Sequence, residues 1–94
     1  MAATPISGSV QPRLTNGVRL QTDSVTGKNV LLHPEGIIEL NETAHEILSY
    51  CDGRTVDDIV RALSEEYDAD PGALSADVRD TLADLYHRQL IHFT

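Results

Sequence analysis

The sequence is poor in aromatic side chains: its 94 residues include no Trp and a single Phe. A hydrophobic core must therefore be built from Leu, Ile, Val and Ala. A single cysteine, Cys51, excludes an internal disulfide and fits a reducing compartment. No apolar run approaches the length of a membrane-spanning helix, and no basic segment precedes an apolar one near the N-terminus. These absences predict a cytoplasmic protein with no membrane partner.

Basic residues are also scarce, with 7 Lys and Arg against 15 Asp and Glu and a formal net charge of −8. Such a charge repels nucleic acid and anionic lipid. A DNA-binding domain must neutralise several phosphates, but in the last predicted helix the acids match or exceed the bases. We therefore predict that nucleic acid is not a partner, and that a charged partner presents a cationic surface.

The residues that could hold a metal or perform catalysis are badly spaced. His87 and His92 lie five positions apart, off a common helical face. A calcium loop starting at Asp68 would need its closing acid where Arg79 stands. Cys51 falls on the apolar stripe of its helix, which indicates a buried structural thiol. Since a glycine-rich phosphate loop and a serine elbow are also missing, we predict no catalytic residue, metal or cofactor, and no enzyme activity.

The N-terminal residues 1–12 mix Ala, Thr, Ser, Gly and Pro without periodicity, which predicts a flexible arm ahead of one domain at 13–94. The alternation of apolar and polar residues over 18–23 predicts the first strand of that domain. The arm and the domain together are too short to divide into two cores.

Two further strands are predicted at 29–33 and 36–40, on either side of Pro34-Glu35-Gly36. This order of residues predicts a hairpin with a three-residue loop closed by a glycine bulge. Both strands carry apolar side chains on both faces, unlike a sheet with one wet face. Either the arm or another chain covers the second face, or one aliphatic side chain stays exposed.

Apolar residues at helical spacing predict three helices, at 42–51, 56–67 and 71–88. Each is preceded by a residue that can cap a helix: Asn41, Thr55 and Asp70. The apolar residues 90–93 either add a last strand or tuck under the sheet. The order predicts an α+β domain, winged helix-turn-helix-like, with a three-stranded antiparallel sheet followed by a three-helix bundle.

The predicted strand at 36–40 lies at an edge of the sheet and carries only one acid, Glu39, and no Lys to discourage pairing. An extended peptide could add itself there as a fourth strand and place alternate side chains against the third helix. Alternatively, the arm protects this edge, or a second copy pairs with it in an edge-paired or segment-swapped homodimer. A dimerisation module that builds a larger assembly without reading a peptide is therefore the second hypothesis.

Three short motifs occur in order along this stretch: Leu-Leu-x-Pro-Glu at 31–35, Leu-Asn-x-Thr-Ala at 40–44 and Cys-Asp-Gly at 51–53. With these motifs, residues 13–93 resemble the PqqD family of pyrroloquinoline quinone (PQQ) biosynthesis. The resemblance implies a non-catalytic peptide chaperone, or RiPP recognition element. Such a protein binds the precursor peptide PqqA and presents it to the radical SAM enzyme PqqE.

In such elements the leader peptide lies along the third strand and against the third helix. The resemblance therefore implies a peptide-binding site formed by both elements. The implied residues are Ile37, Ile38, Glu39, Leu40, Arg79, Leu82, Ala83 and Tyr86. One departure is Gln89, where family members often have glycine, and it bears on the end of the third helix.

Overall fold

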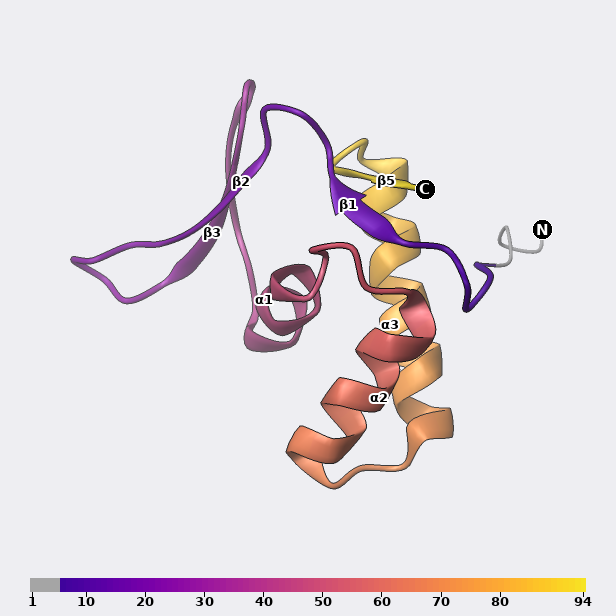
Figure 1. The fold of residues 1–94 in the computed structure, drawn as a ribbon. Helices are drawn as coiled ribbons and strands as arrows, with labels where there is room; N and C mark the ends of the chain where they lie inside the picture. Colours follow the sequence, from indigo (N-terminus) through magenta and orange to yellow (C-terminus); the bar gives the residue numbers. More distant parts are fainter. Residues whose placement is uncertain (1–5) are drawn as a thin grey trace.

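The computed structural model describes residues 6–94, which form two small sheets and three helices. In chain order the elements are β1 (Pro12–Leu14), β2 (Arg19–Thr22), β3 (Asn29–His33), β4 (Gly36–Glu39), α1 (Glu42–Ser49), α2 (Val56–Tyr67), α3 (Pro71–His87) and β5 (Ile91–Phe93). In Figure 1 the sheet of β2 and β3 stands to the left of α3, and α1 lies below it. The predicted α+β class, with an antiparallel sheet followed by three helices, is confirmed.

Strands β2, β3 and β4 form an antiparallel meander in that order. Leu20, Leu31 and Ile38 lie opposite one another and share one face of the sheet, where Leu31 is completely buried. Leu32 and Ile37 share the other face, and Ile37 remains 68% exposed. The sheet is therefore apolar on both faces, as predicted, and an exposed aliphatic side chain accounts for part of the second face.

The turn between β3 and β4 differs from the predicted three-residue loop. It consists of Pro34 and Glu35 alone, because Gly36 already pairs with His33. Gly36 has a φ of +151°, a conformation that a side chain would strain, so the glycine is required at the predicted position.

All three predicted helix caps are formed. The side chains of Asn41, Thr55 and Asp70 accept hydrogen bonds from backbone N–H groups three residues further on, at 2.7, 3.1 and 3.3 Å. The first helix ends earlier than predicted, at Ser49, and Cys51 lies in the turn that follows. The caps therefore fix where the three helices begin.

Of the two alternatives predicted for residues 90–93, the chain forms the last strand: β5 pairs with β1 in a second sheet. Sequence analysis missed β1, because three residues starting with proline show no alternation. The predicted boundary between arm and domain therefore falls inside this strand.

Residues 6–11, within the predicted arm, make backbone hydrogen bonds to the C-terminal residue Thr94 and to the start of α2. Gln11 and Thr94 exchange two bonds, of 3.0 and 2.9 Å. The carbonyl groups of Gly8 and Val10 accept from the N–H groups of Asp57 and Val56, each at 3.0 Å. Residues 1–5 lie outside the described residues, and the flexibility of the arm stays a prediction.

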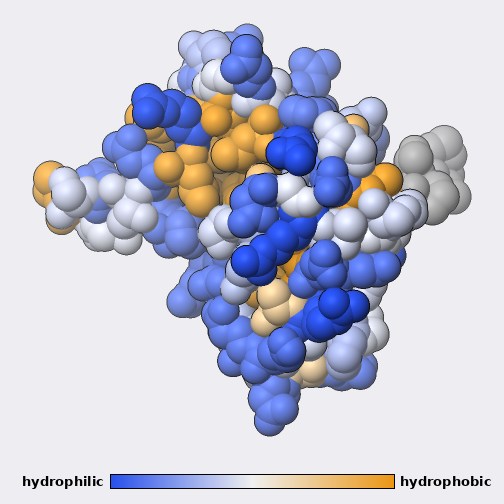
Figure 2. Space-filling model, in the orientation of Figure 1, coloured by the Kyte–Doolittle hydropathy of each residue, from blue (hydrophilic) through white to orange (hydrophobic). Residues whose placement is uncertain are grey.

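The core is formed by aliphatic side chains from all three helices, β3 and β5, as the shortage of aromatic residues requires. Its completely buried members are Leu31, Ile47, Val56, Ile59 and Leu82. In the view of Figure 2, hydrophobic residues gather over the strands in the upper part of the molecule, among hydrophilic neighbours. Among residues 6–94, no helix is long and apolar enough to cross a membrane.

Candidate functional site

Strand β4 forms an open edge of the meander: within residues 6–94, only β3 pairs with it. The backbone N–H of Leu40 donates to the carbonyl oxygen of Asn29 at 2.9 Å, which fixes the alternation along the strand. In an antiparallel pair, successive residues direct their backbone groups alternately toward and away from the partner. The backbone groups of Ile37 and Glu39 therefore point away from β3, toward the open side.

A groove runs between this edge and α3, with a volume of about 390 Å³. One wall is the end of β4 and the start of α1, and the other is one side of α3. The lining residues are Ile38, Glu39, Leu40, Asn41, Thr43, Ala44, Asp80, Thr81, Asp84, Leu85 and Arg88. Apolar side chains thus alternate with polar ones beside unpaired backbone groups, which is the arrangement that peptide binding by strand addition needs.

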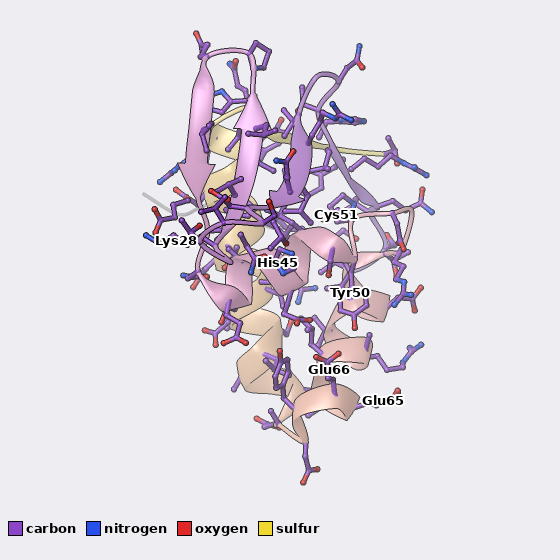
Figure 3. All side chains as sticks on the ribbon, turned by 90° about the vertical axis from the view of Figure 1, so that its left-hand side faces the viewer. Lys28, His45, Tyr50, Cys51, Glu65 and Glu66 are labelled. Atoms are coloured by element: carbon purple, nitrogen blue, oxygen red, sulfur yellow. The ribbon has the colours of Figure 1, made fainter. Side chains whose placement is uncertain are left out.

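Charged residues on both walls of the groove are partly neutralised. The ammonium group of Lys28 lies 3.3 Å from the Glu39 carboxylate, and the Arg88 guanidinium lies 3.2 Å from Asp84. Lys28 is seen at the lower edge of the sheet in Figure 3. Both pairs are exposed and hold their partners only weakly, so a bound peptide can replace them.

The structure places the four predicted strand residues at this edge. Ile38, Glu39 and Leu40 line the groove, and Ile37 contributes its outward-pointing backbone while its side chain lies on the opposite face of the sheet. Their role in binding stays a prediction.

The four predicted helix residues lie elsewhere on α3. Leu82 is completely buried in the core. The Arg79 Nε donates to the carbonyl oxygen of Ile6 at 3.0 Å, and Arg79 also bonds Ser75. Ala83 and Tyr86 line a separate cavity of about 210 Å³, beside Ile6 and Phe93. The predicted helix residues therefore do not face β4.

The helix residues that do face β4 were missed by sequence analysis. They are Asp80, Thr81, Asp84, Leu85 and Arg88. These positions follow helical spacing, and they lie beside the same core stripe as the predicted set, but on its other flank. The stripe itself gives no sign of which flank faces the sheet.

The structure also shows where the residues considered for catalysis and metal binding lie. Burial raises the pKa of the Cys51 thiol to about 12, and its Sγ donates to the Ile47 carbonyl at 3.4 Å. Cys51 is therefore a structural thiol rather than a nucleophile. In the part of the chain that the structure describes, no three His, Cys, Asp or Glu residues are grouped so as to hold a metal ion.

The fold and the site together define a peptide-recognition domain of the RiPP recognition element class. With a TM-score of 0.80 and 44% identity, the fold is similar to the solution NMR structure of the PqqD part of Methylobacterium extorquens PqqCD, which is described as a functional, stand-alone RiPP recognition element. This match covers 98% of the chain and 99% of that structure. A second similar structure is TbiB1 in complex with the TbiA(β) leader peptide, with a TM-score of 0.73 and 26% identity over 85% of the chain and 94% of TbiB1.

The chain belongs to the PqqD family: the family model described as "Coenzyme PQQ synthesis protein D (PqqD)" matches residues 28–91. It is 44% identical over 89 residues to the bifunctional coenzyme PQQ synthesis protein C/D of Methylorubrum extorquens, a match of 94% of the chain to 24% of that relative's length. It is also 39% identical to a PqqA binding protein of Xanthomonas oryzae pv. oryzae, with 92% of the chain and 95% of that protein matched. The resemblance noted from the three motifs is thereby confirmed.

Proposed function

We propose that this chain is a non-catalytic peptide chaperone of PQQ biosynthesis, which binds the precursor peptide PqqA as an added strand on β4. The observation that carries the proposal is the open edge, where the backbone groups of Ile37 and Glu39 point into solvent next to the groove. The relative described as a PqqA binding protein, and the leader-peptide complex of TbiB1, support a peptide as the occupant.

A proline at position 39 tests strand addition directly. The N–H of Glu39 points away from β3, so Glu39→Pro removes a donor to the peptide while leaving the β3–β4 ladder intact. We expect PqqA to bind about tenfold more weakly or worse, because one backbone hydrogen bond is lost and the proline ring obstructs the edge. Calorimetric titration with PqqA measures this effect.

The matched control is Glu39→Gln, which also breaks the exposed pair with Lys28 but keeps the backbone N–H. It should bind PqqA within about twofold of the unmodified chain. Amide spectra of both variants check that the fold is retained. Equal affinity of the Pro and Gln variants would show that the peptide does not pair with β4.

We propose further that the bound peptide is presented to the radical SAM enzyme PqqE, as the family resemblance implies. A cytoplasmic location follows from this role.

A homodimer formed through β4 would occupy the same edge, so peptide and second copy would compete. Sedimentation with increasing PqqA tests this competition, because a dimer that uses the β4 edge should dissociate as the peptide binds. Sedimentation with PqqE tests presentation, which is supported if PqqE joins only the peptide-loaded chain.

A further inference from the structure

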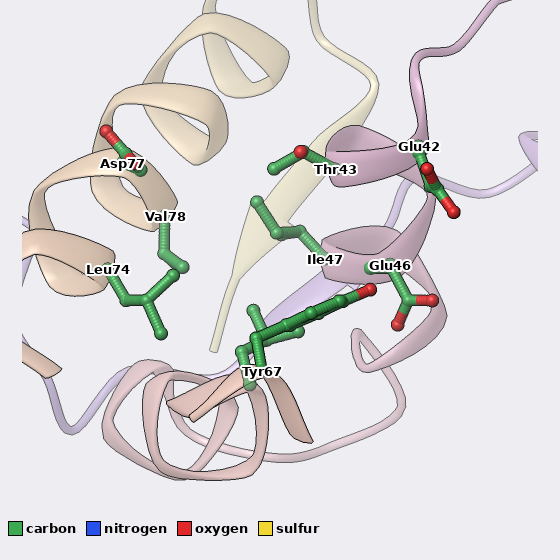
Figure 4. Close-up of a pocket in the computed structure, with 9 residues that line it drawn as sticks. Glu42, Thr43, Glu46, Ile47, Tyr67, Leu74, Asp77 and Val78 are labelled. Carbon is green, nitrogen blue, oxygen red and sulfur yellow. The ribbon is translucent and has the colours of Figure 1, made fainter. Parts of the chain in front are cut away.

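A further cavity, of about 260 Å³, lies where the three helices meet. Figure 4 shows α1 and α3 on opposite sides of it, with the ring of Tyr67 lying across the opening between them. Its apolar lining comes from Ile47, Leu63, Leu74 and Val78, and its polar rim from Glu42, Thr43, Glu46 and Asp77. We call it the helical pocket.

The helical pocket continues the groove beside β4. Thr43, at the start of α1, lines both. The wall formed by α3 is also shared, since Asp77 in the helical pocket lies one helical turn before Thr81 in the groove. A peptide lying along β4 and running past the N-terminus of α1 therefore reaches the helical pocket.

The rim of the pocket is acidic and lacks a compensating base. Glu42 and Glu46 project from α1 and Asp77 from α3, on opposite sides of the cavity (Figure 4), and none of the nine lining residues is basic. Within residues 6–94, no Lys or Arg forms an ion pair with any of these carboxylates. An apolar occupant would desolvate them without compensation, and an anion would be repelled.

The tyrosine adds an aromatic surface to this negative site. Tyr67 is 51% exposed, and its hydroxyl group points toward Glu46 (Figure 4). Desolvation, together with the charges of Glu46 and Glu66, raises the pKa of Tyr67 to about 12. An aromatic face beside carboxylates favours a cation that carries an apolar stem.

We infer that the helical pocket binds a Lys or Arg side chain of the peptide that occupies the groove. Its methylene stem packs on the apolar lining and the Tyr67 ring, while its charge lies at the acidic rim of the pocket. This inference rests on the proposed peptide-binding function and adds a specificity to it: the segment of peptide beyond the groove carries a Lys or Arg.

Neutralising the rim tests the inference. The triple variant Glu42→Gln, Glu46→Gln, Asp77→Asn keeps side-chain size and should bind PqqA about fivefold more weakly. A matched triple variant, Asp52→Asn, Asp57→Asn, Glu65→Gln, removes the same charge from exposed positions outside both cavities. Asp57, like Glu42, lies in the first turn of a helix. Each triple variant therefore loses one favourable interaction between an acidic side chain and a helix dipole. The matched triple should stay within twofold.

A peptide series identifies the partner side chain. PqqA is prepared with each Lys replaced by norleucine and each Arg by citrulline, one position at a time. One replacement should weaken binding to the unmodified chain about fivefold and binding to the rim triple by less than twofold. If every replacement has the same effect on both proteins, the inference is wrong, and it is also wrong if PqqA has no basic residue to replace. Should the rim triple fail to fold, Glu46→Gln alone is used in the same series.

The same titrations separate this inference from the proposed function. If the amide signals of residues 36–40 shift with PqqA but no coupling to the rim appears, strand addition stands and the basic side chain is excluded. If those signals do not shift, the peptide does not use β4, and the proposed function and the inference both fall.

Discussion

The two flanks of α3 differ in what covers them. One flank, with Thr81 and Asp84, faces the edge of β4 across the open groove. The other is partly covered by the chain itself: Arg79 bonds the backbone of Ile6, and the ring of Tyr86 lies 5.1 Å from that of Phe93, centroid to centroid. One flank of α3 therefore makes contacts with other parts of the chain, while the other flank borders an open groove.

The comparison shows why residue type alone is a poor guide to which flank of α3 is left open. The covered flank carries an arginine and an exposed tyrosine, residues enriched at interfaces, yet these contact the N-terminal segment and β5. The open flank carries small and acidic residues. This flank is open to a peptide because the backbone of the neighbouring strand β4 is unpaired. The side chains of α3 give no indication of that unpaired backbone.

Leu82 lies between the two flanks and offers the largest expected effect. It is completely buried, so Leu82→Ala should lower the free energy of unfolding by about 2–5 kcal/mol. Urea denaturation measures the loss. Thr81→Ala, the neighbouring groove position, should change stability by less than about 0.5 kcal/mol. A small loss at Leu82 would mean that this side chain is free to face a ligand, as the family resemblance implied.

A large side chain added to one flank of α3 or to the other should affect PqqA binding differently. Thr81→Trp fills the groove and should weaken PqqA binding about tenfold or more, because the peptide and the indole cannot occupy the same space. Ala83→Trp, two residues further on, places the same ring toward the cavity on the covered flank and should leave affinity within twofold. Titration of both proteins with PqqA provides the measurement. The reverse order would move the binding surface to the covered flank.

Much of the fold was predictable because local signals and burial agreed. Asn41 and Asp70 mark their helix starts through side-chain oxygens, and the residues around Pro34 mark a turn through backbone geometry. Strand β1 was not predictable, since three residues held by distant pairing with β5 carry no local pattern.

The lining of the groove was predictable on the strand and not on the helix, for a geometric reason. A strand repeats every two residues, so Ile38 and Leu40 necessarily share one side once the edge is known. A helix turns about 100° per residue, and the buried stripe through Val78, Leu82 and Leu85 has two flanks. Choosing between them requires the position of the sheet relative to α3, which follows from the whole chain.

The smallest expected effect comes from Arg79, which the resemblance placed in the binding site and the structure places on the covered flank. Arg79→Ala removes the bond to the Ile6 carbonyl and should cost about 1 kcal/mol locally. Hydrogen exchange at the amides of Val56 and Asp57, which bond the same N-terminal segment, should then accelerate about fivefold. PqqA affinity should stay within twofold. A loss of affinity with unchanged exchange would return Arg79 to the peptide site and contradict the division of α3 into a covered and an open flank.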